Sequence, residues 1–464
     1  MSTENPGEGH PISRRMLLKK VAAASAALIP VHAAPQATNV QSTPAVPPSE
    51  RVNLAILGIG GQGSSDCKMM HGTGHCNIVA LCDADIGSPP TLALLKMFPD
   101  APRFQDFRRM FDKMDKQIDA VVIAVPDHSH FPAAMQAMAL GKHVFVEKPL
   151  AHSFQEVDLM MAAERKYEVA AQMGNQGYSG ANHFQFKAWT ESGIIRNVTK
   201  IHAFMSSTRV WHGWTVNEPP PAEPVPGTLD WDLWNGTAEM RPFSSKYHPY
   251  SWRSWFPYGT GAFGDWGAHI LDTIHHFLDL GMPEEIEAVR REGASDYIFP
   301  QASTIAFRFP ARGAHPAVEV TWFDGLKNRP PRPAELEAGR ELPDNGKIIY
   351  SKDLVFLGGT HSATLRIIPD ARMREMSESL PRITGRNSDH YLNFLLACKG
   401  TEKCRSSFDV AGPLTQVFLL GAIAQRLGGT LKFDRKSRRI TNRKEADALL
   451  APPPRKGWER YYIL

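Results

Sequence analysis

The stretch RVNLAILGIGGQG, from Arg51 to Gly63, decides the fold of the first half of the chain. Its apolar run, Leu54 to Leu57, predicts a buried β-strand that leads directly into a loop with the spacing G-x-G-x-x-G. The glycines of this loop are Gly58, Gly60, Gly61 and Gly63. Glycine-rich turns are common in proteins, so the meaning of the loop depends on the residues that come after it in the chain.

A second strand, IVALCDAD, comes after a helix-like stretch and carries Asp83, 20 residues beyond Gly63. An acidic residue at this place accepts hydrogen bonds from an adenosine ribose, while the glycines let backbone N–H groups approach a pyrophosphate at a helix N-terminus. No Arg or Lys stands beside Asp83, and the next acid, Asp85, would repel a 2′-phosphate. The pattern therefore predicts a Rossmann domain that binds NAD in preference to NADP.

The alternation of strands and helices continues to about residue 174, so the Rossmann domain is predicted to span residues 51–174. Buried strands are expected at Ile118 to Val125, His143 to Val146 and Val169 to Met173, with a helix at Pro132 to Leu140. Ligands of such sheets bind at the carboxyl ends of the strands. The residues there that we expect to contact NAD are Pro126, His128, His130, Glu147, Lys148 and Asn175. For His128 and His130, simple packing of the loop is an equally good interpretation.

A polar row in the second half of the chain raises a separate question. In DWGAHILD, steps of four and three residues place Asp265, His269 and Asp272 along one face of a helix. A carboxylate near a helix N-terminus would explain Asp265 alone. His269 and Asp272 lie one and two turns further on, among apolar residues, and suggest a functional site.

Five motifs, GIGGQG, CDAD, VPDHSH, VEKPL and GTGAFGDWGAHILD, occur in this order, and together they resemble the Gfo/Idh/MocA oxidoreductase family. The resemblance covers residues 51 to about 434 and is strongest to an exported branch of that family. It implies a Rossmann domain followed by an α/β domain, residues 175–434, with a large, open, mostly antiparallel sheet. Candidate strands of that sheet are Lys200 to Ser206, Thr304 to Phe309, Ala317 to Phe323, Leu354 to Leu357 and Ala363 to Ile368. The resemblance also implies a homo-oligomer.

Members of this family oxidise a secondary hydroxyl of a sugar or polyol by hydride transfer to the nicotinamide. Lys148, Asp265 and His269 match the family's catalytic lysine and its Asp-x-x-x-His pair. A histidine suits a general base, and a lysine suits the stabilisation of developing alkoxide charge. Which of the two moves the proton is left open. Asp272 and Arg253 are expected to bind substrate hydroxyls.

Two other functions compete with a sugar, glycoside or polyol oxidoreductase. One is an NAD-dependent glycosidase, in which transient oxidation permits elimination of the aglycone; relatives with that activity tend to replace the lysine that Lys148 retains. The other is a non-catalytic carbohydrate-binding protein, which the intact Lys148, Asp265 and His269 disfavour. The product formed from an aryl glycoside would separate the first two.

Seven of the ten tryptophans fall between Trp211 and Trp266, together with Arg209 and His212. They suit a sugar-stacking platform or, equally well, a core. Further along, one of His275 and His276 is expected to pack and the other to cap or face solvent. No Cys, His or carboxylate spacing resembles a metal site, and none is predicted.

The N-terminus resembles a twin-arginine export signal. SRRMLLK, Ser13 to Lys19, precedes an apolar stretch and a small-residue cleavage site that ends at Ala33, although leucine replaces the usual aromatic residue at position 17. Residues 1–33 are thus predicted to be a signal, either cleaved or kept as an anchor, and residues 34–50 a Pro-rich arm. The expected partner is the twin-arginine export machinery, and the expected location is the periplasm.

The remaining composition sets broad limits. The chain has 464 residues, 42% of them hydrophobic, and a net charge of +4 with both signs interspersed, which favours a small-molecule ligand over nucleic acid. No interior apolar run approaches about 20 residues, so stable membrane insertion is not expected. The five cysteines form no CxxC pair and are expected to be thiols. A basic tail, residues 435–464, is expected to fold against the Rossmann domain or a neighbour.

Overall fold

The computed structural model describes residues 46–206, 216–383 and 388–464. The predicted signal, residues 1–33, and most of the predicted arm, residues 34–50, lie outside the described residues. The chain divides into two units, and every described residue belongs to the unit Ser42–Leu464. The end of the predicted arm forms a short 3-10 turn, η1 (Pro48–Glu50), beside the first strand.

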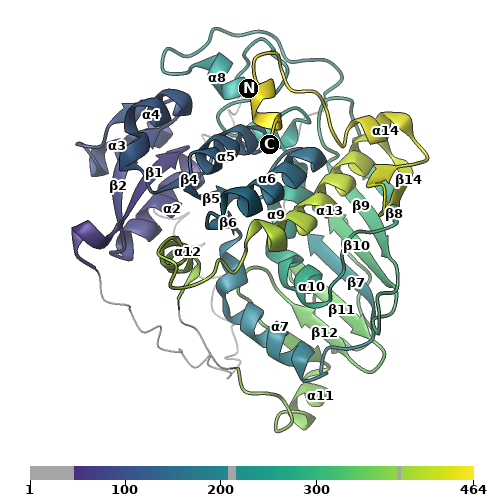
Figure 1. Ribbon diagram of the computed structural model, residues 1–464. Helices are drawn as coiled ribbons and strands as arrows, with labels where there is room; N and C mark the ends of the chain where they lie inside the picture. The colour runs from purple at the N-terminus through teal and green to yellow at the C-terminus, as the bar shows by residue number, and fades with distance from the viewer. Residues whose placement is uncertain (1–45, 207–215, 384–387) are drawn as a thin grey trace, which may run out of the picture. The chain divides into compact units, whose positions relative to one another are not determined.

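The first half of this unit is built on a six-stranded parallel sheet with the order β3-β2-β1-β4-β5-β6 (Figure 1). This order is that of a doubly wound, dinucleotide-binding sheet, and it confirms the predicted Rossmann fold. The strands are β1 (Val52–Leu57), β2 (Cys76–Cys82), β3 (Arg103–Phe104), β4 (Ala120–Ile123), β5 (His143–Glu147) and β6 (Ala171–Gly174). The connecting helices are α2 (Gly61–Gly72), α3 (Leu92–Met97), α4 (Phe107–Met114), α5 (His130–Ala139) and α6 (Phe154–Tyr167).

The second half is built on a nine-stranded sheet with the order β13-β12-β11-β7-β10-β9-β8-β14-β15. Within it, β7 and β10 pair in parallel and the other neighbours are antiparallel, as predicted. The five expected strands form with small shifts, as β7 (Val198–Met205), β9 (Ala302–Phe309), β10 (Val318–Asp324), β12 (Val355–Gly358) and β13 (Leu365–Ile368). Four further strands were not expected: β8 (Glu285–Glu292), β11 (Asn345–Ser351), β14 (Gly429–Asp434) and β15 (Arg439–Ile440).

A layer of helices packs between the two sheets (Figure 1). It consists of α7 (Ala181–Glu191), α9 (Gly261–Ile270), α10 (Asp272–Phe277) and α13 (Phe408–Leu427). Helix α13 is long and apolar enough to cross a membrane by length and composition alone, but 78% of its apolar window is buried inside the protein. It contacts α6 of the first domain and α9 of the second, so its apolar composition is that of a core helix.

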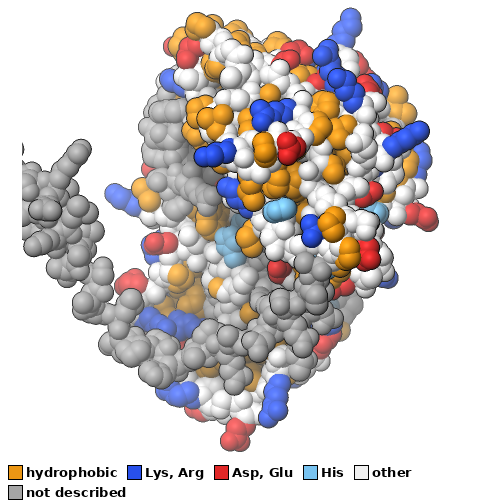
Figure 2. All heavy atoms as spheres, turned by 90° about the vertical axis from the view of Figure 1, so that its left-hand side faces the viewer, with side chains coloured by type: hydrophobic (Ala, Val, Ile, Leu, Met, Phe, Trp, Pro, Cys, Tyr) orange, Lys and Arg blue, Asp and Glu red, His pale blue; other side chains and the backbone are white. Residues whose placement is uncertain are grey.

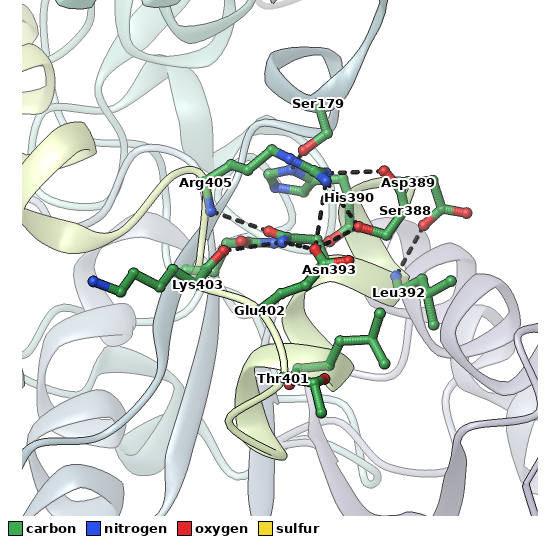
Figure 3. Close-up of polar contacts among 12 residues, drawn as sticks. Ser179, Ser388, Asp389, His390, Leu392, Asn393, Thr401, Glu402, Lys403 and Arg405 are labelled. Atoms are coloured by element: carbon green, nitrogen blue, oxygen red, sulfur yellow. Dashed lines mark hydrogen bonds and ion pairs between the residues drawn. The ribbon is translucent and has the colours of Figure 1, made fainter. Parts of the chain in front are cut away.

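Helix α12 (His390–Cys398), from the second half of the chain, packs against the Rossmann domain, and the hydrogen bonds drawn in Figure 3 hold it there. Asp389 caps the helix by accepting from the Leu392 N–H at 2.9 Å. The His390 ring lies 2.8 Å from the Ser179 hydroxyl and 2.8 Å from the Met173 carbonyl of β6. These contacts fix the neighbouring Tyr391, which faces α2.

The chain beyond Asp434 returns to the Rossmann domain, as predicted. The short strand β15 pairs with β14, and α14 (Lys444–Ala448) comes next. The last turn, η7 (Glu459–Tyr462), packs on α4 and α5: the rings of Trp458 and Phe107 are 6.3 Å apart, and the Tyr461 hydroxyl donates to Gln136 at 3.0 Å. On the face that Figure 2 shows, acidic and basic side chains are interspersed.

Candidate functional site

The glycine loop after β1 leaves room for a ligand close to the backbone. Gly58 has a φ of +80°, and a Cβ there would come within 2.5 Å of the Ala124 carbonyl oxygen. Gly60 precedes α2 and Gly61 begins it, so the first N–H groups of α2 face the loop. Gly63, like Gly58, lies against protein backbone, because a Cβ there would lie 1.8 Å from the Gly58 oxygen. It permits close packing of α2 and does not line the pocket.

A pocket of about 230 Å³ runs along the carboxyl ends of the parallel strands. Asp83 lines it at one end and Lys148 lines it at the other. The Asp83 carboxylate accepts from the Ile59 N–H at 2.8 Å and from the Asp85 N–H at 2.9 Å, while burial raises the pKa of Asp83. Because the carboxylate is fixed beside the loop and borders the pocket, it is placed where an adenosine ribose is bound in this fold.

The two histidines of PDHSH differ in position. His130 lines the pocket, and its ring nitrogens lie 2.8 Å from the carbonyl oxygens of Val125 and Pro149. His128 lies behind the pocket wall, where its ring is 2.8 Å from the Trp234 oxygen and 3.3 Å from the Tyr258 oxygen. Burial lowers the pKa of His130 to about 4 and that of His128 to about 3, so both are neutral near pH 7. For His128, the loop-packing interpretation holds.

Lys148 and Asp265 form an ion pair that joins the two domains. Lys148 directly succeeds β5, and its Nζ contacts Oδ1 of Asp265 in α9. The Nε of Arg253 lies 3.2 Å from the same oxygen, and its guanidinium lies 4.2 Å from the centre of the Trp252 ring. Burial alone would raise the pKa of Asp265, but Lys148 and Arg253 hold it well below its ordinary value. Asp265 is therefore an anion at any pH at which the protein works.

His269 lies one helical turn beyond Asp265 and is buried. Its ring stacks on the ring of His361, with centroids 4.0 Å apart and planes inclined by 14°. Its carbonyl oxygen accepts from the His361 N–H at 2.8 Å. Asp265 and His269 are four residues apart in α9, so their side chains lie on the same face of the helix. Lys148, Asp265 and His269 therefore form one continuous group.

Asp272 departs from the predicted row. The helix is interrupted at Leu271, so Asp272 begins α10 and is not on the same helix as Asp265. Asn175 donates its amide to Asp272 at 3.5 Å, and the buried ammonium of Lys347 acts on it electrostatically. Burial raises the pKa of Asp272 to about 6. Like Asp265 and His269, neither Asp272 nor Asn175 lines the pocket; Asp272 and Asn175 belong to this second buried group.

The described tryptophans of the Trp-rich segment mainly form a core. Trp231 and Trp234 stack at 4.7 Å, and both are buried with Trp252 and Trp255 in one apolar cluster. The Trp231 indole donates to the Arg241 oxygen at 2.7 Å, and that of Trp255 donates to the Lys246 oxygen at 2.8 Å. Trp234 and Trp252 also border the pocket. The predicted contributions of Trp211, Trp214, Arg209 and His212 lie outside the described residues.

Several pocket residues carry no recognisable sequence signal. His248 reaches over from the second domain to Asp85, with its Nε2 2.7 Å from Oδ2. Tyr250 is largely exposed at the rim, and Trp458 of the C-terminal tail closes one side. Each of these residues is far in sequence from the motifs that form the rest of the pocket, so spacing along the chain does not predict its position.

The remaining polar predictions concern side chains outside the pocket. His275 is buried, with its Nε2 2.9 Å from the Gly281 oxygen, and His276 is exposed, which confirms one packed and one exposed ring. All five cysteines are free thiols. Among the described residues there is no group of three or more His, Cys, Asp or Glu side chains that could hold a metal ion.

The protein combines a parallel sheet, a glycine loop and the pocket residue Asp83 with a second, mixed sheet. These features are typical of a two-domain, nucleotide-dependent oxidoreductase. Models of one oxidoreductase family match both domains: its NAD-binding Rossmann fold matches residues 52–175, and its C-terminal α/β domain matches residues 182–299. The chain belongs to this family, Gfo/Idh/MocA, and NAD is its cofactor.

The matches to curated relatives cover about a third of this chain. Glycosyl hydrolase family 109 protein 2 of Shewanella sp. (strain ANA-3) is 30% identical over 141 residues, which are 29% of this chain and 30% of that protein. Inositol 2-dehydrogenase of Salmonella typhimurium is 29% identical over 153 residues, 32% of this chain and 45% of that protein. The matches thus span less than half the length of these relatives.

Solved structures match the whole fold at low identity. The WlbA dehydrogenase from Chromobacterium violaceum, in complex with NADH and UDP-GlcNAcA, has a TM-score of 0.54 at 14% identity and covers 84% of this chain and 99% of its own. An aldose-aldose oxidoreductase from Caulobacter crescentus has a TM-score of 0.52 at 14% identity and covers 82% of this chain and 100% of its own. At this identity the likeness concerns the fold alone.

Proposed function

We propose that this protein oxidises a secondary hydroxyl of a sugar, glycoside or polyol by transferring hydride to NAD. The observation that carries the proposal is the Lys148–Asp265 ion pair at the end of the NAD pocket. It joins a strand end of one domain to a helix of the other, with Arg253 and His269 beside it. The names of an inositol dehydrogenase and of sugar-nucleotide and aldose oxidoreductases among the similar proteins support the class of substrate.

The residues present fit NAD. Gly58 and Gly60 keep side chains out of the loop, and the start of α2 offers unpaired N–H groups to a pyrophosphate. Asp83 borders the pocket at the end where the ribose of the adenosine is expected. Lys148 and Glu147 border the other end. NAD, when bound there, supplies the acceptor for the hydride.

The chain itself must remove the hydroxyl proton and stabilise the charge on the oxygen. Lys148 offers a positive charge held in place by Asp265, and Arg253 offers a second donor to the same carboxylate. His269, fixed by its stack on His361, offers an imidazole as the base. His269 can take the proton as a neutral imidazole, or Lys148 can take it once its ammonium has given up its own proton, and both lie beside Asp265. Asp265 keeps its negative charge throughout and holds the side chains of Lys148 and Arg253 in position.

The proposal is tested with purified protein and a panel of sugars and polyols, by the absorbance of NADH. Wild-type protein is expected to reduce NAD with at least one member of the panel. Lys148→Ala is expected to lose roughly 100-fold or more in turnover, measured at saturating NAD. Unchanged turnover in Lys148→Ala would contradict the catalytic assignment, and an absence of any nucleotide affinity would favour a carbohydrate-binding protein instead.

The glycosyl hydrolase family 109 relatives favour a second candidate, an NAD-dependent glycosidase. In that reaction the same site would oxidise a hydroxyl, eliminate the aglycone and return the hydride, with no net change in NAD. The retention of Lys148 disfavours it. An aryl glycoside separates the two: a keto-sugar with an equal amount of NADH supports the dehydrogenase, and released aglycone without NADH supports the glycosidase.

We also propose export by the twin-arginine pathway and assembly into a homo-oligomer. Export is supported by the Arg14–Arg15 pair and the apolar stretch after it. Replacing both arginines by lysine in the full chain is expected to keep the protein in the cytoplasmic fraction, and unchanged periplasmic recovery would contradict this. Light scattering of the purified protein measures the oligomer, and a monomer at all concentrations would contradict the second proposal.

A further inference from the structure

A second carboxylate, Glu147, lies beside Lys148 and faces a buried aspartate. Glu147 ends β5 and Asp66 lies in the second turn of α2; both are buried. Their carboxyl groups are neighbours, because one side-chain amide reaches both of them. The Gln176 amide bridges them, with Nε2 2.6 Å from Glu147 Oε1 and 3.5 Å from Asp66 Oδ1.

The other contacts of Asp66 are concentrated on one oxygen. Gln62 Nε2 and the Tyr391 hydroxyl each donate to Asp66 Oδ1 at 2.8 Å. Among the described residues, no group donates a hydrogen bond to the other carboxylate oxygen, Asp66 Oδ2. That oxygen is the one left to share a proton with Glu147.

The surroundings cannot hold both carboxyl groups as anions. The nearest cation, Lys148, is already paired with Asp265, and the other titratable group that faces the pair is Tyr391, which is a neutral donor. Two buried carboxylates that share one amide donor repel each other, so one of them stays protonated. Glu147 also borders the NAD pocket, which brings the charge of the pair to the cofactor.

We propose that Asp66 and Glu147 hold one proton between them at neutral pH, and that the charge of this pair sets the preference of the pocket for oxidised over reduced NAD. The oxidised nicotinamide ring is positively charged and the reduced ring is neutral, so each negative charge near it favours the oxidised form. At low pH the pair holds two protons and is uncharged. When it releases one of them to solvent, its charge changes from zero to −1. The proposal rests on NAD binding and does not depend on the identity of the substrate.

The pKa values give the direction of the pH effect. Burial raises the pKa of Asp66 to about 6, and burial followed by the charge of Asp66 raises the pKa of Glu147 well above its ordinary value. The pair is therefore neutral below pH 6 and singly negative above it. Raising the pH through this range should tighten NAD⁺ relative to NADH.

The test measures the dissociation constants of NAD⁺ and NADH with nucleotide-free protein, by titration calorimetry. For the wild type, the ratio of the NADH constant to the NAD⁺ constant is expected to rise roughly tenfold between about pH 5 and about pH 8. The double variant Asp66→Asn, Glu147→Gln is expected to show no such rise. A constant ratio in the wild type, or a rise that survives in the double variant, would overturn the proposal.

Asp324→Asn is the matched control. Asp324 is also buried, and burial raises its pKa to about 6, but it lies in β10 and hydrogen-bonds Trp322, Ser303 and Gln425. This variant should keep the wild-type rise in the ratio. Loss of the rise in Asp324→Asn would show that a general effect of buried carboxyl groups is responsible, and would overturn the proposal.

Two further measurements cover a double variant that fails to fold. Tyr391→Phe removes a donor that favours the ionised form of Asp66, so it should move the rise in the ratio to higher pH; no movement, or movement to lower pH, overturns the proposal. In the infrared spectrum of nucleotide-free protein at neutral pH, the band of a protonated carboxyl group should be weaker in Glu147→Gln than in Asp324→Asn. Equal bands would also overturn it.

Discussion

Asp265 and Asp272 stand seven residues apart, are both buried, and have opposite electrostatic environments. Asp265 contacts two cations, Lys148 and Arg253, and its pKa is held well below the ordinary value. Asp272 accepts from the amide of Asn175 and has a single cation nearby, Lys347, whose ammonium donates to the Ile270 carbonyl at 2.9 Å. Burial dominates there and raises the pKa of Asp272 to about 6.

The comparison shows that burial and sequence spacing do not decide what a carboxylate does. The break at Leu271 turns Asp272 toward the second domain's own sheet, where Lys347 belongs to β11. Asp265 faces the end of β5 in the other domain. Asp265, which stays charged, lies at the junction of the two domains, where a reaction needs a fixed electric field. Asp272, which can titrate, lies inside one domain.

The largest expected effect is a difference in turnover between variants of Asp265 and variants of Asp272. Asp265→Asn removes the charge that holds Lys148 and Arg253, so turnover is expected to fall roughly 100-fold or more, because misplaced catalytic groups lose most of their advantage. Asp272→Asn is the matched control and is expected to change turnover by no more than about threefold. Steady-state kinetics on the substrate found in the panel measure both.

Two outcomes would break this contrast. Equal losses in the two variants would place Asp272 in the substrate site, as the sequence suggested. A loss in Asp265→Asn that is matched by an equal loss of NAD affinity would indicate a collapse of the pocket and not a missing charge.

The next effect is on stability and has opposite signs for the two residues. The folded pKa of Asp265 is depressed, so its contribution is present above the ordinary pKa of 3.8 and is lost as the pH falls through the folded value. The folded pKa of Asp272 is raised, so its contribution is present below 3.8 and is lost as the pH rises through about 6. By pH 7 the ionisation of Asp272 costs on the order of 3 kcal/mol.

Denaturant unfolding from about pH 4 to about pH 7 measures this cost. Relative to wild type, Asp272→Asn should gain stability steadily between pH 3.8 and pH 6, where the unfolded wild-type chain has lost this proton and the folded chain still holds it. Asp265→Asn should show no such gain. A flat difference for Asp272→Asn would mean that Lys347 compensates the charge fully.

The Rossmann half could be predicted from the sequence because its information is local. Each buried strand is a short apolar run, and each functional group stands directly after a strand, as Asp83 does after β2 and Lys148 after β5. The second sheet could be predicted only in part. β8, which lies between β9 and β14, is a half-exposed strand with many charged residues, EIEAVRRE, and β11 includes the buried Lys347, so neither has the composition of a core strand.

The site could be predicted where its residues share a motif, but not where distant segments meet. Lys148, Asp265 and Arg253 come together as expected. His248 and Trp458 reach the pocket from a loop and from the tail, and Asp66 meets Glu147 through the tertiary fold. Contacts of this kind depend on how domains close over each other, which spacing along the chain does not encode.

A smaller effect is expected at the adenosine end of the pocket, away from both aspartates. Asp83→Asn keeps an oxygen for the Ile59 N–H and loses the charge, so NAD is expected to bind roughly tenfold more weakly. Turnover at saturating NAD should stay near the wild-type value, in contrast to Asp265→Asn. Titration of NAD and NADP shows the second consequence, which is a smaller preference for NAD. An unchanged preference would mean that Asp83 does not face the ribose.

The smallest effect is expected from removing both charges of the second group together. A buried ion pair replaced by neutral side chains of similar size often leaves stability unchanged, because the cost of burying two charges disappears with their attraction. In Lys347→Met, Asp272→Asn, the free energy of unfolding is therefore expected to stay within about 1 kcal/mol of wild type, with turnover within about threefold. Burial lowers the pKa of Lys347 to about 8, which shows that burying this ammonium is itself unfavourable. The single variant Lys347→Met should cost more, since it leaves Asp272 without a cation. If the double variant instead loses turnover as Asp265→Asn does, the two aspartates act as one group and the contrast between them fails.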